Sequence, residues 1–271
     1  MKIAYVGIDL LYPALKALWD NRCEIIKIFT CKTNNVTEFN EQIVEFAKNN
    51  NISYTLERIT VNDILWLKEM GCELLICGGY YYKIPVDESL PMINIHPTLL
   101  PVGRGSWPMP LIILRGDKKS GVTFHKISEG FDEGDIILQK EFNISDNESH
   151  ESYMKKSGDL AYVMINELLA NFELLYSNAK PQGEGEYLQE PKREVFTINE
   201  NSSFKNTDLI LRAFYGYECY YEKADKIYEI IKGEVVKEKM FTQSMEGVYL
   251  PIKGGYVWCP IVKEVMMRIY D

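Results

Sequence analysis

The first half of the chain alternates short apolar runs with segments in which apolar residues recur at helical spacing. Apolar runs that predict strands occupy residues 2–8, 24–30, 52–59, 73–79 and 93–97. Helical patterns lie at residues 11–19, 38–50 and 62–70. Strands that alternate with helices predict right-handed crossovers and an α/β fold with a doubly wound, mainly parallel sheet. Ligands of such sheets bind at the carboxyl ends of the strands.

The second half of the chain follows a different pattern. Residues 151–176 form the longest helical pattern, and we expect this helix to lie on the sheet and to close a first domain at residues 1–180. Turns rich in glycine and proline then mark residues 181–204 as a linker. Residues 205–271 combine one short helical pattern with short strands interrupted by glycine and proline, which predicts a small, mostly β C-terminal domain.

Composition and charge narrow the class of protein. The 271 residues are 46% hydrophobic and 25% charged, as in ordinary globular proteins. The net charge of -9 disfavours a nucleic-acid partner, because such partners are usually bound through an excess of Lys and Arg. The chain shows no signal-peptide pattern and no apolar run of about 18 residues, so we expect a cytoplasmic protein without membrane association. The six cysteines are scattered, which fits reduced thiols.

Two polar segments that follow predicted strands carry the residue types of a reaction centre. Asn94 and His96 point to the same side of a strand because they are two residues apart. An amide beside an imidazole suits acyl transfer, since the amide N–H can bind an oxyanion and the imidazole can move a proton. Asp132, between Gly130 and Gly134, could supply a carboxylate that orients the imidazole. The residues alone leave a structural histidine and an ordinary turn aspartate as alternatives.

Five short motifs surround these residues. They are Asn94-x-His96-Pro97, Leu99-Leu100-Pro101, Arg104-Gly105, Gly121-Val122-Thr123-x-His125 and Asp132-x-Gly134-Asp135-Ile136. Together they closely resemble the signature of the formyltransferases that use 10-formyltetrahydrofolate. The resemblance covers residues 1–180 and implies a Rossmann-like formyltransferase fold, with Asn94, His96 and Asp132 as the catalytic residues. It also implies that Asn94 and protonated His96 stabilise the oxyanion, that Asp132 sets the ionisation of the histidine and helps to relay the amine proton, and that no metal takes part.

By the same resemblance, the pterin of the donor lies between two loops. One wall is formed by Tyr80, Tyr81, Tyr82, Lys83 and Ile84, and the other by Ile127, Ser128 and Glu129. The alternative for the three tyrosines is a surface aromatic cluster. His125 belongs to one of the motifs, but it could equally be a strand-end histidine bonded to the backbone, so we place it beside the site and not in it.

The family formylates several amines, and we favour a nucleotide-linked amino sugar. Initiator tRNA is disfavoured because both parts of the chain are acidic, with 18 basic against 24 acidic residues up to residue 180 and 12 against 15 beyond it. Glycinamide ribonucleotide would leave residues 181–271 unexplained. The expected acceptor is therefore a dTDP- or UDP-linked amino-deoxy sugar for glycan biosynthesis, with a pseudaminic-acid-type pathway as one option. Its expected contacts are Arg104, Gly105 and Trp107, although Arg104 could be a surface arginine and Trp107 could simply pack on its loop.

Three other functions stay open at this point. A methionyl-tRNA formyltransferase has the same domain order, and a formyltetrahydrofolate hydrolase would use the same three residues with water as acceptor. A folate-binding module is the non-enzyme alternative. From the family we expect a homodimer, whose interface could include the apolar strands of the C-terminal domain and its aromatic run, Phe214, Tyr215, Tyr217, Tyr220 and Tyr221.

Overall fold

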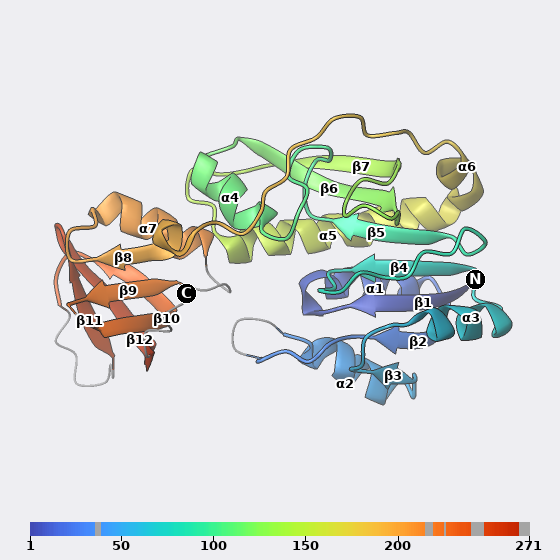
Figure 1. Cartoon of the computed structure of the whole chain (residues 1–271), viewed down its shortest axis with the longest axis horizontal. Coiled ribbons are helices and arrows are strands. Elements are labelled where there is room, and N and C mark those ends of the chain that lie inside the picture. The colour runs from blue at the N-terminus through green and yellow to red at the C-terminus, as the bar shows by residue number, and fades with distance from the viewer. Residues whose placement is uncertain (36–38, 215–218, 225, 240–246, 266–271) are drawn as a thin grey trace.

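The computed structural model describes residues 1–35, 39–214, 219–224, 226–239 and 247–265, with side chains up to residue 260. It contains two sheets that a linker joins (Figure 1). The strands of the first sheet are β1 (Lys2–Gly7), β2 (Glu24–Phe29), β3 (Tyr54–Thr55), β4 (Leu74–Gly78), β5 (Met92–His96), β6 (Lys119–Lys126) and β7 (Ile136–Asn143). Their order is β3-β2-β1-β4-β5-β6-β7, and only the β5–β6 and β6–β7 pairs of this sheet are antiparallel within the described residues. The prediction of a mainly parallel α/β sheet is confirmed.

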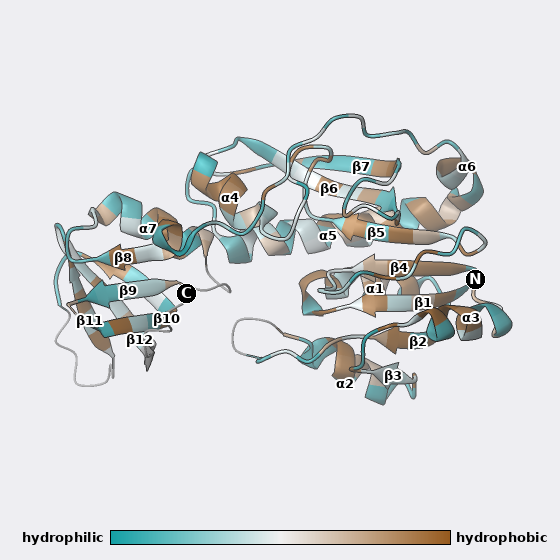
Figure 2. Cartoon of the chain, in the orientation of Figure 1, coloured by the Kyte–Doolittle hydropathy of each residue, from teal (hydrophilic) through white to brown (hydrophobic). Residues whose placement is uncertain are grey.

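Helices cover both faces of this sheet. On one face lie α1 (Tyr12–Asp20), α2 (Glu41–Asn49), the long α5 (His150–Ala170) and α6 (Phe172–Ser177), which share a hydrophobic core with the strands. On the other face α3 (Val61–Glu69) packs on the first strands through Ile64 and Leu67. Figure 2 shows the apolar central strands between these helical layers. Both α3 and α5 begin with a capping box, at Thr60 and Ser149, which satisfies N–H groups of the first turn.

The alternation of side chains along β5 decides where the polar residues of this strand lie. Ile93 and Ile95 are buried in the core that contains α5. Because successive side chains of a strand point to opposite faces, Asn94 and His96 face away from α5. This face lacks the cover of α3, which packs near β1 and β4. The fold therefore leaves a place for a site beyond the end of β5.

The C-terminal domain is a second sheet with one helix. Its strands are β8 (Thr197–Asn199), β9 (Tyr220–Lys223), β10 (Lys226–Val236), β11 (Val248–Ile252) and β12 (Gly255–Val265), in the order β11-β12-β10-β9-β8. The helix α7 (Phe204–Ala213) packs on α4 (Pro108–Arg115) of the first domain, and one hydrophobic cluster spans both domains. The prediction of a small, mostly β domain is confirmed. Tyr215 and Tyr217, named above for a dimer interface, lie outside the described residues.

Several elements differ from the prediction. The strand β8 lies inside the segment 181–204 that we expected to be a linker, and β7 matches no predicted strand. The strand expected over residues 52–59 has only two paired residues, Tyr54 and Thr55, because it lies at the edge of the sheet. The helix expected over residues 151–176 is interrupted at Asn171, which separates α5 from α6. The helix α4 was not predicted, because its two prolines hide it; they lie in its first turn, where a missing N–H costs nothing.

Candidate active site

Two neighbouring antiparallel strands, β5 and β6, present the polar side chains of Asn94, His96, Thr123 and His125 on one face. Asn94 lies directly opposite His125, and its Nδ2 is 3.0 Å from Nε2 of the histidine. Nδ1 of His125 is 2.8 Å from the carbonyl of Lys126. A carbonyl can only accept, so Nδ1 carries the hydrogen and Nε2 accepts from Asn94. His125 thus does bond to the backbone, as one alternative held, but it also belongs to the cluster around Asn94.

Asp132 comes to the same cluster from the loop between β6 and β7. Its φ of 56° lies in the left-handed region, and its Oδ2 accepts a hydrogen bond from the backbone N–H of Gly105 at 2.9 Å. Its Oδ1 lies 3.2 Å from Nδ2 of Asn94, 3.4 Å from Nδ1 of His96 and 3.6 Å from Nε2 of His125. The structure therefore brings Asn94, His96 and Asp132 together, and it adds His125.

Burial decides how His96 and Asp132 ionise. His96 is 5% exposed, and burial lowers its pKa even though the Asp132 carboxylate raises it. Burial alone would raise the pKa of Asp132, but His96, His125 and the N–H of Gly105 together hold it well below its usual range. Burial therefore favours a neutral ring, whereas the two oxygens that face its nitrogens, the Gly103 carbonyl and the Asp132 carboxylate, favour a protonated one. The protonated His96 that the resemblance implies stays a prediction.

A loop that is hydrogen-bonded to β6 and α5 holds the other side of the His96 ring. Nε2 of His96 donates to the carbonyl of Gly103 at 2.7 Å, so Nδ1 is the nitrogen that faces Asp132. The hydroxyl of Thr123 on β6 donates to the carbonyl of Thr98 at 2.7 Å, and the hydroxyl of Tyr153 on α5 donates to the carbonyl of Pro97 at 2.8 Å. These bonds tie the loop to β6 and α5, and the loop in turn fixes the plane of the imidazole.

Two of the three residues that we expected to contact the acceptor, Arg104 and Trp107, make contacts within the protein. The Arg104 guanidinium is 6% exposed and donates to the side chain of Gln182 and to the carbonyl of Gly183, both in the linker. Nε and Nη2 are therefore used inside the protein, and a contact of Arg104 with the acceptor stays a prediction. The Trp107 ring stacks on Phe196 at 5.8 Å between centroids, so it packs between the domains and not only on its own loop, and a contact with the acceptor stays a prediction. Gly105 does lie at the site, through its bond to Asp132.

The two expected walls of the pterin site lie next to each other. Nζ of Lys83 forms an ion pair with Glu129 at 2.8 Å, which joins the two loops directly. Ile84 is buried in a cluster against which Tyr80 and Ile127 pack. Tyr81 and Tyr82 are 47% and 42% exposed, and the Tyr82 ring packs against Tyr80 and Arg58. Ser128 hydrogen-bonds within its own loop, to the carbonyl of Gly130 at 3.2 Å.

Some features of the site carry no sequence signal. The carbonyl of Gly103 acts through the backbone and belongs to none of the motifs, and the Arg104-Gly105 motif does not show that the N–H of Gly105 binds Asp132. Gln182 donates to the carbonyls of Asp132 and Gly134 at 2.9 and 2.6 Å, although it lies in the turn-rich segment that we expected to be a simple linker. Only the tertiary fold brings it to the site.

The described residues show neither a metal-binding cluster nor a membrane-spanning helix. They contain no group of three His, Cys, Asp or Glu side chains that could hold a metal ion. None of their helices combines the length and the apolar character that crossing a bilayer requires.

Comparison with known proteins identifies the family. Residues 34–169 match the formyl transferase family, and methionyl-tRNA formyltransferase of Ehrlichia ruminantium (strain Gardel) is 35% identical over 221 residues, which are 78% of this chain and 71% of that protein. The chain therefore belongs to the formyl transferase family. This sequence relative is a tRNA enzyme and not the sugar enzyme that we favoured.

Two solved structures share the fold. HypX from Aquifex aeolicus in complex with tetrahydrofolic acid has a TM-score of 0.70 at 18% identity, and the match covers 96% of this chain but only 43% of HypX. The N-formyltransferase from Helicobacter canadensis, in complex with folinic acid and dTDP-3-aminofucose, has a TM-score of 0.62 at 19% identity and covers 95% of this chain and 98% of that one. This chain thus spans less than half of HypX and nearly the whole length of the second protein.

Proposed function

We propose that this protein transfers a formyl group from 10-formyltetrahydrofolate to a primary amine. The observation that carries the proposal is the cluster around Oδ1 of Asp132, which lies 3.2 Å from Nδ2 of Asn94 and 3.4 Å from Nδ1 of His96. The folates bound to HypX and to the Helicobacter canadensis enzyme support a folate donor. In this chain the donor would lie between loops 80–84 and 127–129.

The reaction forms one C–N bond and breaks another. The uncharged amine attacks the formyl carbon, and the carbonyl electron pair moves to oxygen to give a tetrahedral oxyanion. Asn94 is the group that reaches this oxygen, because it is partly exposed while His96 and His125 are buried. Both Nδ2 hydrogens of Asn94 face protein acceptors, Asp132 and His125. One of these two hydrogen bonds is therefore replaced by a hydrogen bond to the oxyanion.

The amine proton leaves through Asp132 and His96. The low pKa of Asp132 makes it a poor final acceptor, so we place the proton on Nδ1 of His96 in the neutral form of the ring, which burial favours. Asp132 then stabilises the imidazolium, as the carboxylate of a triad does. When the bond from the formyl carbon to N10 breaks, the same proton returns to N10. The products are tetrahydrofolate and the formylated amine.

We propose the methionyl group of initiator tRNA as the acceptor. The support is the 35% identity over 221 residues with a methionyl-tRNA formyltransferase. The net charge of -9 weakens this choice without removing it, since a local basic surface can exist on an acidic protein.

A nucleotide-linked amino sugar is the second candidate, and the charge pattern favours it. Many lysines of the first domain pair with carboxylates, for example Lys16 with Asp20 at 3.0 Å and Lys119 with Glu141 at 2.7 Å. Cations that are neutralised by their neighbours contribute less to a surface that attracts an RNA backbone. A diphosphate needs far fewer positive charges than a tRNA does.

One experiment tests the donor and separates the acceptors. Purified protein is given 10-formyltetrahydrofolate with charged initiator tRNA, with a panel of dTDP- and UDP-linked amino sugars, or with no acceptor, and tetrahydrofolate release is followed together with the mass of the acceptor. We expect formylmethionyl-tRNA. Formylation of a sugar alone would replace the tRNA proposal by the second candidate. Release of tetrahydrofolate without an acceptor would indicate a hydrolase, and no release under any condition would contradict formyl transfer.

A further inference from the structure

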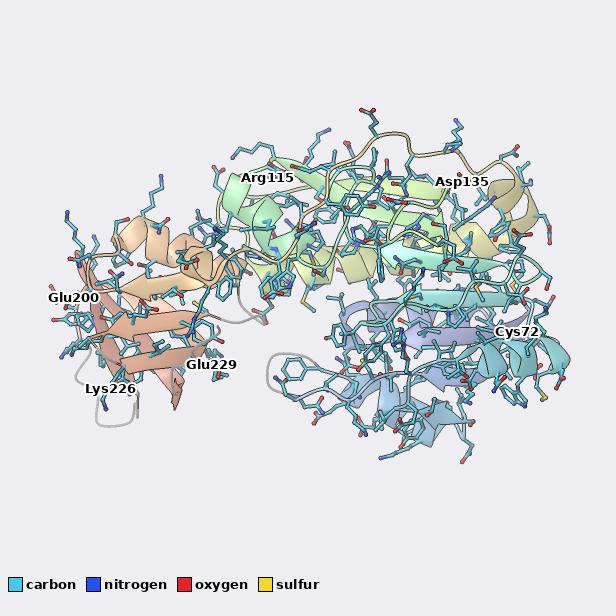
Figure 3. All side chains as sticks on the ribbon, in the orientation of Figure 1. Cys72, Arg115, Asp135, Glu200, Lys226 and Glu229 are labelled. Atoms are coloured by element: carbon cyan, nitrogen blue, oxygen red, sulfur yellow. The ribbon has the colours of Figure 1, made fainter. Side chains whose placement is uncertain are left out.

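The linker between the two sheets runs across the loops that hold the catalytic residues. Lys180 and Ile136 exchange two backbone hydrogen bonds, of 2.8 and 2.9 Å. Further along the linker, the N–H of Glu186 donates to the carbonyl of Pro101 at 3.0 Å. Arg115, labelled at the end of α4 in Figure 3, forms an ion pair of 2.7 Å with the Glu186 carboxylate. The linker is therefore bonded to both loops of the candidate active site.

Gln182 lies at the centre of these contacts, and its amide is fully used. Its Nε2 donates to the carbonyl of Asp132 at 2.9 Å and to that of Gly134 at 2.6 Å. Its Oε1 accepts from Nε and Nη2 of Arg104 at 3.1 and 2.9 Å. Carbonyls only accept and a guanidinium only donates, so only one orientation of the amide satisfies all four bonds.

We infer that Gln182 is a positioning residue that holds Asp132, through its backbone, at the distance from His96 that proton transfer requires. This inference rests on the proposed function and extends it. Two separate bonds fix Asp132: Gln182 holds its carbonyl, and the N–H of Gly105 holds its carboxylate. Asp132 also has a left-handed φ of 56°, a conformation that persists in a residue other than glycine where the surroundings enforce it.

Arg104 gives Gln182 its own fixed place. The guanidinium is 6% exposed, and it also donates to the carbonyl of Gly183 at 3.0 Å. The linker passes so close over it that a Cβ on Gly185 would lie 2.7 Å from its Cζ. A buried cation with two linker partners cannot move far without losing them. The chain of contacts thus runs from Arg104 through Gln182 to Asp132 and His96.

The first test compares the kinetics of variants. Gln182→Ala removes all four bonds, and Gln182→Met removes them while filling a similar volume. We expect kcat for formyl transfer to fall roughly 10- to 100-fold in both variants, because the residues that hold a catalytic group affect the rate by fixing the position of that group. KM for the donor should change less than about threefold, since the pterin loops are untouched. The matched control is Gln189→Ala, which alters an exposed glutamine of the same linker and should leave kcat unchanged.

The second test does not depend on the acceptor. NMR titration of the imidazoles, assigned with His-to-Asn variants, measures the pKa of His96 in the wild type and in Gln182→Met. The charged or titratable groups that face this ring are Asp132 and His125, and Asp132 is the one that raises its pKa. We therefore expect a lower pKa for His96 in the variant, because the carboxylate is no longer held against Nδ1.

The outcomes separate the inference from the proposed function. A folded Gln182→Met protein with the wild-type kcat, or with an unchanged His96 titration, would overturn the role of Gln182. So would a loss of kcat that merely follows the unfolded fraction measured by circular dichroism. A wild-type protein that formylates no acceptor would contradict the proposed function, and the titrations would still decide the question of Gln182.

Discussion

Asp132 is the residue on which the polar groups of the site converge. Its Oδ1 lies within 3.6 Å of nitrogens from Asn94, His96 and His125. The motifs predicted three of these four residues, since their spacing is a property of the sequence. They left His125 beside the site, because its role depends on the register of β6 against β5. They do not show that burial lowers the pKa of His96, because a pKa depends on the surroundings of the group in the fold.

At the residue scale, we predict that Asp132→Asn lowers kcat by about 10²- to 10⁴-fold, the usual contribution of a group that moves a proton. The amide fills the same space but cannot stabilise an imidazolium at His96. The carboxylate raises the pKa of His96, so its loss should lower this pKa further and move the acid limb of kcat/KM to lower pH. Steady-state rates across the pH range measure both effects, and an unchanged kcat would contradict the assignment.

A second prediction at this scale concerns stability and pH. Because the pKa of folded His96 is lowered, the unfolded chain takes up the proton first when the pH falls below about 6.5. The contribution of His96 to the free energy of unfolding is therefore complete above this pH. It decreases as the pH falls toward the pKa that His96 has in the folded protein. Urea unfolding between about pH 7.5 and pH 5.5 should show a smaller loss of unfolding free energy for His96→Asn than for the wild type. Equal losses would argue against a lowered pKa.

At the scale of elements, the sequence predicted most of the first domain within a few residues. The patterns at residues 11–19 and 62–70 became α1 and α3, and the apolar runs became strands of the sheet. The linker could not be assigned a role in the site, because Gln182 reaches Asp132 over 50 residues of chain. Local patterns predict elements, whereas contacts of this length depend on how the elements pack.

The loop between β6 and β7 gives a prediction with a control in the same loop. A Cβ on Gly134 would lie 1.8 Å from the carbonyl oxygen of Lys126, which is backbone. A Cβ on Gly130 would meet only the flexible side chain of Glu133. We expect Gly134→Ala to displace Asp132, to lower the free energy of unfolding by about 1–3 kcal/mol and to reduce kcat at least ~10-fold. Gly130→Ala should cost under about 1 kcal/mol in urea unfolding and keep most of the activity. Equal effects of the two variants would contradict this account.

At the scale of the whole molecule, the two domains share one hydrophobic cluster. Met109 and Ile112 of α4 belong to the same cluster as Ile210 of α7 and Val257 of β12. The linker is bonded to the active-site loops along its first residues. Both connections join the C-terminal domain to the first domain, so the C-terminal domain stands in a defined place relative to the site.

Trp107 tests this shared core. Its ring lies 5.8 Å from that of Phe196 and 6.1 Å from that of Phe214, and it is partly exposed. We expect Trp107→Ala to lower the free energy of unfolding by about 2–4 kcal/mol, somewhat less than for a fully buried tryptophan. Val195→Ala, at a neighbouring position that is 40% exposed, is the control and should cost under about 1 kcal/mol. Urea unfolding followed by circular dichroism measures both, and an equally small cost for Trp107→Ala would contradict a shared core.

The acidity of the whole molecule makes the salt dependence of KM a test of the acceptor. If a tRNA binds through about four phosphates, raising the salt from about 50 to 200 mM should raise its KM by roughly 10²-fold. Binding releases counterions from the RNA, and a higher salt concentration opposes this release. A sugar nucleotide carries only a diphosphate, so its KM should rise only a few-fold, by about the amount that screening of two charges gives. KM for 10-formyltetrahydrofolate, measured at the same salt concentrations, controls for general effects on the enzyme. With a net charge of -9, the protein can bind tRNA only where its basic residues gather. A KM for tRNA that does not change with the salt concentration would contradict binding through the phosphates.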